Sequence, residues 1–283
     1  MSAHVSRLFG LLALLCNAPG LLAYPLDGHE ETGIQRLAGY QIAQVTKGQP
    51  KLTRGQLLGS SDITLKLTTY DGPDFDQLPE DPGLSEFLNE VLKDRNPSYA
   101  MVLVDIGNPA AIRWAGLRPD SRQNPGSVGK LITMVGLFHA LKDAFPDEAD
   151  RARKLRESIT SAGNWVGIEQ HKVPKWNGEL QVNESSVIVP TDAFRLSEWL
   201  DHAISASANG AGAIVWRETM LIRHFGSSYS RSAEESDNFF RETPKPELGE
   251  LSRKVAFEAL QAAGIDTANL QQGSFWTANG KNK

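Results

Sequence analysis

The residues best suited to chemistry in this sequence are a serine and a lysine three positions apart, Ser127 and Lys130. They belong to the stretch Asn124-Pro-Gly-Ser-Val-Gly-Lys130, where a turn gives way to an apolar run that continues to Leu141. Residues three apart on a helix share one face, so the lysine amine can lie beside the serine hydroxyl. An amine in that position can take the hydroxyl proton. The pattern therefore predicts a nucleophilic Ser127 with Lys130 as its base.

Two other interpretations of the same residues compete with this one. A Ser-x-x-Lys pattern arises by chance about once in a chain of this composition, so a partner motif is needed. Gly126-Ser-Val-Gly-Lys130 also looks like a phosphate-binding loop. However, the first glycine of G-x-x-x-x-G-K-[ST] falls on Asn124, and Leu131 replaces the magnesium-binding hydroxyl. The phosphate loop is the weaker alternative, and the chance match is tested by what lies downstream.

The composition sets the broad class of protein. The 283 residues are 40% hydrophobic and carry a formal net charge of −5, with 29 Lys and Arg against 34 Asp and Glu. This length and apolar content suit one large globular domain or two. A protein that binds a phosphate backbone needs a basic excess, so nucleic acid is not an expected partner.

The N-terminus has the pattern of an export signal. Arg7 provides a short positive region, residues 8–16 are almost wholly apolar, and Ala23 offers a small residue for cleavage. A membrane anchor is the alternative, but the apolar run is too short to span a bilayer as a helix. We expect residues 1–23 to be removed, which leaves a mature chain without cysteine and without a stable membrane span. A periplasmic or secreted bacterial protein fits this best.

The chain before Ser127 is expected to contain an extension and a linker. Residues 24–70 are predicted to form a small β-rich extension, with strands near 40–45 and 63–68, where apolar and polar residues alternate. Residues 71–83 hold three prolines and five acids, which indicates a linker. The further elements expected here are a helix over 84–92 and a β-hairpin with strands over 99–105 and 111–116.

The chain after Ser127 is expected to be mainly helical, forming an all-α subdomain over about 128–263. The helix over 128–141 is apolar nearly all round, which predicts a core helix. The alternating charges of 147–157 instead predict a solvated helix. Residues 164–190 show no clear period. The remaining expected helices span 192–204, 211–222 and 251–263, with a small-residue break over 205–210.

A second motif, Ser207-Ala-Asn209, lies in that break between two helices. Together with Ser127-Val-Gly-Lys130 it resembles the S-x-x-K and S-x-N motifs of class A β-lactamases and penicillin-binding proteins. The resemblance runs from about 84 to 222, roughly half of the chain, and includes the flanking elements. Ser236-Asp-Asn238 is closer to S-D-N in letters, but no apolar helix leads into it. Ser207 is therefore favoured.

The resemblance implies an α+β fold of the α/β sandwich type, in which an antiparallel sheet lies beside an all-α subdomain. The family-like domain is expected over 84–283. The family's third motif, K-T-G on a core strand, is absent from the sequence. We therefore expect an incomplete member, a truncated or fragmentary chain whose C-terminal strands are missing.

The resemblance also implies a role for each matched residue. Ser127 would attack a carbonyl and become acylated, with Lys130 accepting its proton, a role that requires the neutral amine. Ser207 would pass a proton to the leaving nitrogen. Asn209 would hold Lys130 and donate to the substrate amide. The Ser127 backbone N–H would form half of the oxyanion hole, and such a donor contributes about 3 kcal/mol.

The expected substrate is a β-lactam or a peptidoglycan-like peptide, and both fit this chemistry. No Glu-x-x-Leu-Asn follows Asn209, so no residue is assigned as the deacylating base. The alternative is a catalytically incomplete relative that binds cell-wall peptide or a protein partner through the same groove. The six histidines form no H-E-x-x-H, and without mature cysteine neither a metal nor a cofactor is expected.

Overall fold

The computed structural model describes residues 25–49, 51–53, 56–63, 77–122, 124–167, 171–268 and 270. The chain divides into two compact units, one formed by Met1–Ile63 with Ser127–Lys283 and the other by Thr64–Gly126. The expected signal peptide and the expected strand over 63–68 lie outside the described residues, apart from Ile63. The described elements are helices and small antiparallel sheets, which makes the fold α+β as predicted.

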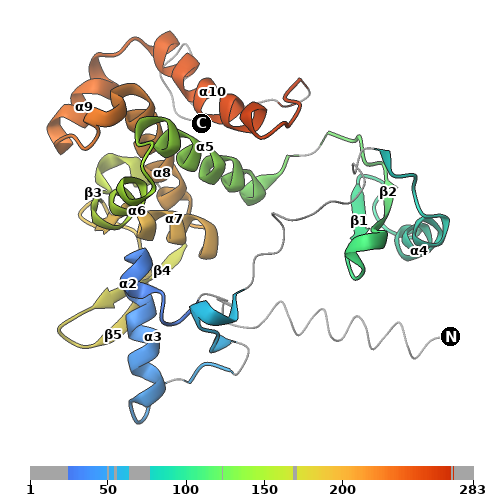
Figure 1. The fold of residues 1–283 in the computed structure, drawn as a ribbon, viewed down its shortest axis with the longest axis horizontal. Helices are drawn as coiled ribbons and strands as arrows, with labels where there is room; N and C mark the ends of the chain where they lie inside the picture. The colour runs from blue at the N-terminus through green and yellow to red at the C-terminus, as the bar shows by residue number, and fades with distance from the viewer. Residues whose placement is uncertain are drawn as a thin grey trace. The chain divides into compact units, whose positions relative to one another are not determined.

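The larger unit is built around helix α8 (Asn209–Phe225), which contacts several other helices along its length (Figure 1). Its inward residues join one apolar core with residues of the neighbouring helices, including Leu137, Leu141, Trp199, Ile214, Met220 and Leu221. The other helices of this core region are α5 (Lys130–Ala144), α6 (Glu148–Glu157), α7 (Leu196–Ser205), α9 (Ala233–Glu242) and α10 (Lys245–Ala262).

Helix α5 forms where the sequence predicts it but is buried on one side only. Leu137 and Leu141 are fully buried, whereas Leu131 and Phe138 remain 47% and 46% exposed. The difference arises because α8 and α10 contact α5 through its Leu137 face. The expectation of a helix buried all round was therefore wrong for the opposite face. Helix α6 has no buried residue, as its charges predict.

Two small sheets flank these helices. Strand β4 (Lys172–Asn177) pairs antiparallel with β5 (Val182–Val187), and β3 (Ile159–Ser161) pairs with β6 (Ala193–Arg195). Residues 164–190 show no clear period in the sequence, so the β4–β5 hairpin was not predicted. Its turn spans residues 178–181, and Asn177 Oδ1 accepts from the N–H groups of Glu179 and Leu180, each at 3.1 Å. Helix α7 also begins later than expected, because 193–195 form β6 before it.

The N-terminal extension is helical in its described part, so the predicted strand at 40–45 was wrong. Helices α2 (His29–Thr32) and α3 (Gln35–Val45) occupy this region, and α3 lies against the β4–β5 hairpin. Residues 35–45 are rich in Gln, Arg, Leu and Ala, which favour helix. Leu37 is buried while Val45 is 87% exposed, so burial follows one helix face rather than alternate positions.

In its described residues the smaller unit contains one α-helix and one β-hairpin. Helix α4 (Pro82–Leu92) begins at Asp81, whose carboxylate accepts from the Leu84 N–H at 2.9 Å. Strand β1 (Met101–Asp105) pairs antiparallel with β2 (Arg113–Leu117) in the register Leu103 to Ala115. These three elements confirm the helix and hairpin that the sequence predicts.

Candidate active site

The structure brings all four predicted site residues together around the Lys130 amine. Lys130 Nζ lies 3.1 Å from Ser127 Oγ and 2.9 Å from Asn209 Oδ1. It lies 3.0 Å from the Ser207 carbonyl oxygen and 3.3 Å from Ser207 Oγ. Lys130 is the first residue of α5 and Asn209 the first of α8, so the cluster joins the N-terminal ends of two packed helices.

Ser127 lies in a short 3₁₀ turn, η6 (Gly126–Gly129), immediately before α5. Gly126 has a φ of +54°, a left-handed conformation that glycine adopts without steric cost. Its N–H donates to Asn124 Oδ1 at 2.9 Å. The Ser127 N–H precedes the first i to i+3 bond of the turn, so the turn itself offers it no acceptor. The Ser127 side chain is exposed and open to a ligand.

Ser207 has an unusual backbone. Its φ of 55° is left-handed, which costs a non-glycine residue about 1 kcal/mol or more. The loop is held on its far side by the Ala208 N–H, which donates to the His202 carbonyl at 3.1 Å. This conformation lets both the carbonyl and the hydroxyl of Ser207 approach the same amine. Strain of this kind is common at functional sites.

Gly212, on the first turn of α8, makes room for the lysine stem. A Cβ added there would lie 3.3 Å from Lys130 Cε, tighter than an ordinary van der Waals contact. A glycine therefore lets the stem run along α8 toward Ser207. The sequence signal for this position was the run of small residues after Asn209.

A buried ion pair supports α7 just before the Ser207 loop. Arg36 of α3 donates to both carboxylate oxygens of Asp201, at 2.5 and 2.7 Å, and Ser205 Oγ donates to the same carboxylate at 2.8 Å. Burial raises the pKa of Asp201, but the hydrogen bonds and charge of Arg36 outweigh it and hold that pKa below its usual value. Sequence reasoning missed this support, because nothing local links Arg36 to a residue 165 positions away.

His202 lies beside Asp201 and is 2% exposed. The pKa of His202 is lowered to about 4, mainly by burial and also by the charges of Arg36 and Lys175, while Asp201 and Asp192 oppose this shift. The imidazole is therefore neutral at pH 7. Its Nδ1 lies 3.9 Å from the nearer Asp201 oxygen, beyond hydrogen-bond distance. His202 acts here as a core residue whose carbonyl anchors the Ser207 loop.

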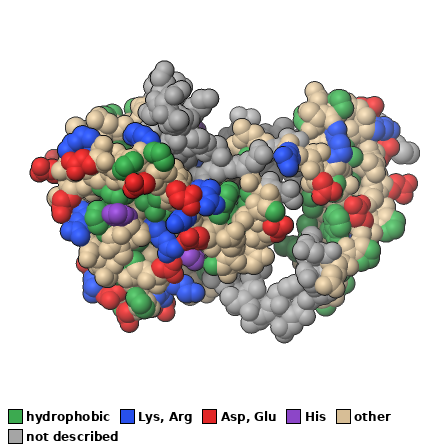
Figure 2. Space-filling view, turned by 90° about the horizontal axis from the view of Figure 1, so that it is seen from above, with side chains coloured by type: hydrophobic (Ala, Val, Ile, Leu, Met, Phe, Trp, Pro, Cys, Tyr) green, Lys and Arg blue, Asp and Glu red, His purple; other side chains and the backbone are tan. Residues whose placement is uncertain are grey.

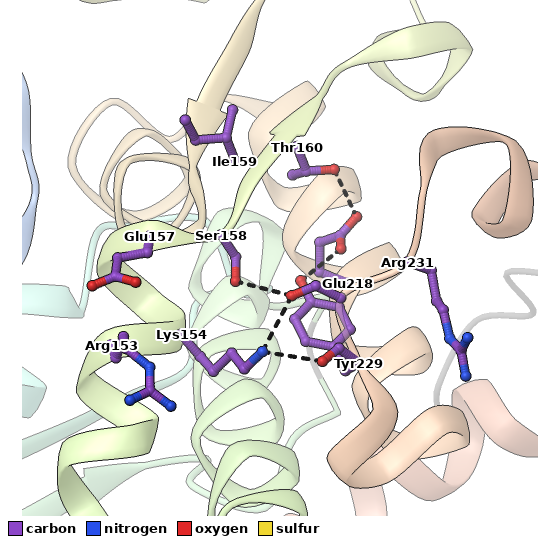
Figure 3. Close-up of a pocket in the computed structure, with 10 residues that line it drawn as sticks. Arg153, Lys154, Glu157, Ser158, Ile159, Thr160, Glu218, Tyr229 and Arg231 are labelled. Carbon is purple, nitrogen blue, oxygen red and sulfur yellow. Dashed lines mark hydrogen bonds between the residues drawn. The ribbon is translucent and has the colours of Figure 1, made fainter.

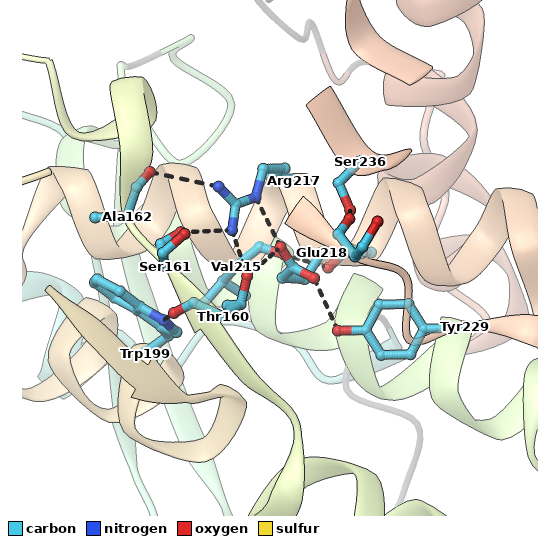
Figure 4. Close-up of polar contacts among 11 residues, drawn as sticks. Thr160, Ser161, Ala162, Trp199, Val215, Arg217, Glu218, Tyr229 and Ser236 are labelled. Atoms are coloured by element: carbon cyan, nitrogen blue, oxygen red, sulfur yellow. Dashed lines mark hydrogen bonds and ion pairs between the residues drawn. The ribbon is translucent and has the colours of Figure 1, made fainter. Parts of the chain in front are cut away.

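Helix α8 carries a second polar cluster, which is buried (Figure 4). Arg217 Nε donates to Glu218 Oε1 at 2.7 Å, and its terminal nitrogens donate to Thr160 Oγ1 and to the Ser161 carbonyl. The Tyr229 hydroxyl donates to the other Glu218 oxygen at 2.8 Å. Burial first, and then the charge of Glu218, raise the pKa of Tyr229 well above its usual value. The charges of Arg217 and Glu218 thus satisfy each other inside the core.

The competing S-D-N letters do not belong to either cluster. Ser236 and Asn238 lie on α9, where Ser236 Oγ donates to the Ser232 carbonyl and Asn238 Oδ1 accepts from Arg241. Each of these hydrogen bonds stays within α9 and its cap. The Ser207 motif lies between two core helices whereas the Ser236 motif lies on α9, and this difference in position distinguishes them.

Among the described residues no group of three or more His, Cys, Asp or Glu side chains could hold a metal ion. Within that part of the chain, no helix has the length and apolar content needed to cross a bilayer. Basic and acidic side chains are interspersed on the face drawn in Figure 2.

Comparison with known proteins adds no relative to this picture. No family model, no curated protein and no solved structure matches the chain.

Proposed function

We propose that the chain is an exported serine hydrolase of the β-lactamase and penicillin-binding type, which forms an acyl-enzyme at Ser127. The observation that carries the proposal is the Lys130 amine, placed within 3.3 Å of Ser127, Ser207 and Asn209 oxygens. Motifs separated by about eighty residues in the sequence meet at one atom. The finer fold assignment, a β-lactamase-like domain, belongs to the same proposal.

The geometry supports proton transfer from Ser127 to Lys130. The Ser207 carbonyl and Asn209 Oδ1 can only accept hydrogen bonds, and two N–H groups of a neutral amine can satisfy them. The lone pair can then accept the Ser127 hydroxyl proton across 3.1 Å. As that proton leaves, Ser127 Oγ bonds to the substrate carbonyl carbon, and the carbonyl π electrons move to oxygen.

Ser207 is suited to the second half of acylation. Its hydroxyl can donate a proton to the leaving nitrogen while it receives one from Lys130, 3.3 Å away. The carbon–nitrogen bond then breaks, the oxyanion electrons re-form the carbonyl, and the proton taken from Ser127 ends on the amine product. Lys130 returns to its neutral form, so the step balances without an added reactant.

The oxyanion formed in between has two sources of stabilisation. The Ser127 N–H has no acceptor within its turn, and the N-terminal ends of α5 and α8 both lie at the site. Helix N-termini carry partial positive charge, which favours a developing anion.

A second candidate function is binding of a cell-wall peptide or a protein partner without hydrolysis, and two observations favour it. The 283 residues contain no Lys-Thr-Gly, and Ser127 is exposed. A chain with the first two motifs alone can hold a cell-wall peptide or a protein partner at the same face without completing hydrolysis. Acylation separates the two functions.

The test is covalent labelling with a fluorescent penicillin, followed by mass spectrometry of the peptide that contains Ser127. The hydrolase proposal expects a stable or transient adduct of one penicilloyl group on Ser127. Ser127→Ala and Lys130→Met should lose it, whereas Lys142→Met, an exposed lysine later on α5, should keep it. Equal labelling of the wild-type chain and Ser127→Ala, or no labelling of either, would leave only the binding function.

A further inference from the structure

A cavity of about 310 Å³ lies away from the candidate active site, between α6, β3 and the segment that follows α8 (Figure 3). Its lining includes three basic side chains and three hydroxyls, from Arg153, Lys154, Ser158, Thr160, Ser230 and Arg231. None of the four residues of the cluster, Ser127, Lys130, Ser207 and Asn209, lines this cavity. This cavity and the cluster at Ser127 are therefore separate features of the same unit.

Lys154 is the basic residue at the centre of the cavity wall. Its amine donates to the Tyr229 carbonyl at 3.1 Å and to Ser230 Oγ at 3.4 Å, and it lies 5.2 Å from the ring centroid of Phe145. No carboxylate lies within ion-pair distance of this half-buried amine in the part of the chain that the structure describes. A partly desolvated cation whose partners are all neutral favours an anion beside it.

Two hydroxyls lie next to this amine. Ser158 Oγ and Ser230 Oγ are 3.5 Å apart, and Ser230 also contacts Lys154. A hydroxyl can rotate to donate to a ligand, so the amine and both hydroxyls can serve one group of oxygens. They come from α6, from the segment between α6 and β3, and from the segment after α8.

Two arginines line the cavity and are drawn on either side of Lys154 in Figure 3. Arg153 pairs with Asp150 at 2.5 Å, and Arg231 pairs with Glu235 at 3.3 Å. Both are local pairs three or four residues apart with exposed partners, and such pairs contribute little to stability. Arg231 also lies over the Phe225 ring, 4.7 Å from its centroid, so Arg153 is the guanidinium that can turn to a ligand at the smaller cost.

The acids at the cavity do not cancel this charge. Both oxygens of Glu218 already accept hydrogen bonds, from Arg217 and Tyr229, and Arg217 neutralises it from within the core. Glu157 is exposed, and in Figure 3 its carboxylate is drawn turned away from Lys154. A ligand in the cavity therefore contacts the basic side chains and hydroxyls of the lining rather than its carboxylates.

We propose that this cavity binds a small phosphate-type oxyanion, either inorganic phosphate or the phosphoryl group of a small molecule. Lysine binds phosphate as a point charge, and the several oxygens of a phosphate-type group can accept from more than one donor at once. Here the central cation is a lysine, and the donors surround it from several directions, which suits a tetrahedral group. The site is independent of chemistry at Ser127.

The experiment measures inorganic phosphate binding to the full chain by titration calorimetry, with sodium chloride added to keep the ionic strength constant. Wild-type protein should bind one phosphate saturably. Lys154→Met should weaken binding about tenfold or more, because it removes the charged donor. Lys142→Met, the matched loss of an exposed lysine, and Ser127→Ala should bind as the wild type does.

A second variant protects the test from a folding failure. Ser158→Ala with Ser230→Ala removes only hydroxyls, and it should weaken phosphate binding several-fold while circular dichroism stays unchanged. Glucose 1-phosphate in place of phosphate distinguishes a phosphoryl ligand from the free ion. The proposal is overturned if wild-type protein shows no saturable binding, if Lys154→Met binds equally well, or if acetate binds as tightly as phosphate.

Discussion

Helix α8 carries two polar clusters about two turns apart, and they use a basic side chain in opposite ways. At its N-terminal end the Lys130 amine meets a hydroxyl, an amide and a carbonyl oxygen, from Ser127, Asn209 and Ser207, beside an exposed Ser127 side chain. Farther along, Arg217 is 5% exposed and paired with Glu218. A cation matched by a carboxylate inside the core stabilises the fold. An amine that contacts hydroxyl, amide and carbonyl oxygens next to an exposed serine is positioned for proton exchange with that serine.

The largest test of this contrast removes the buried cation. Arg217→Met should lower the free energy of unfolding by about 3–5 kcal/mol, because it leaves Glu218 charged and unpaired in the core. Lys130→Met should change it by about 1 kcal/mol or less, since Lys130 is only partly buried. Urea unfolding measures both. Arg217→Met combined with Glu218→Gln should recover much of the lost stability. Equal losses in Arg217→Met and Lys130→Met would contradict the contrast between the two clusters.

The second test uses pH, and it concerns the support of the Ser207 loop. His202 has a pKa of about 4 in the folded protein and about 6.5 when unfolded, so between these values the unfolded state binds more protons. Its contribution is complete above pH 6.5 and is lost as pH falls toward 4, by about 3 kcal/mol in total.

Urea unfolding at a series of pH values from 7 to 4 measures this slope. His202→Gln should flatten it, whatever its effect on stability at pH 7, whereas His224→Gln, an exposed control on α8, should leave it unchanged. An unaltered slope in His202→Gln would assign the acid sensitivity to other groups.

A smaller effect is expected from the turn before Ser127. Gly126→Ala should cost about 1 kcal/mol, because the left-handed φ disfavours a Cβ even though open space surrounds it. Penicillin labelling of Ser127 should fall by more than the loss of folded protein alone explains, since the turn positions Ser127. Gly48 also has a left-handed φ, +85°, with open space around it, and it takes no part in the cluster, so Gly48→Ala serves as the control. A parallel loss in both variants would argue against positioning.

The smallest effect runs in the opposite direction. Ser207→Gly should raise the free energy of unfolding by about 1 kcal/mol or less, because glycine adopts φ 55° without strain. The same change removes the hydroxyl next to Lys130 and should reduce labelling. Ser207→Ala should reduce labelling without the gain in stability. If Ser207→Ala also raised the free energy of unfolding, the gain would not come from relief of strain at the Ser207 φ.

The sequence predicted the cluster better than it predicted the elements around it. Ser127 and Lys130 lie on a turn and a helix with strong local signals, and Ser207 sits in a clear helix break. These local features fix the ends of α5 and α8, and packing of the two helices does the rest. Helix α3 was missed because its few apolar residues also fit alternation, and contact with β4 and β5 decides its form. The link from Arg36 to Asp201 has no local signal at all.

That same link has a consequence for the order in which the chain acquires its structure. Helix α3 is synthesised before its ion-pair partner, which lies 165 residues further along the chain. Until Asp201 has emerged and α7 has formed, Arg36 has no acceptor there, and an eleven-residue helix is marginal alone in water. We therefore expect α3 to become ordered only after α7 has formed. Through the ion pair of Arg36 with Asp201, α3 then fixes the position of α7, the helix that leads into the Ser207 loop.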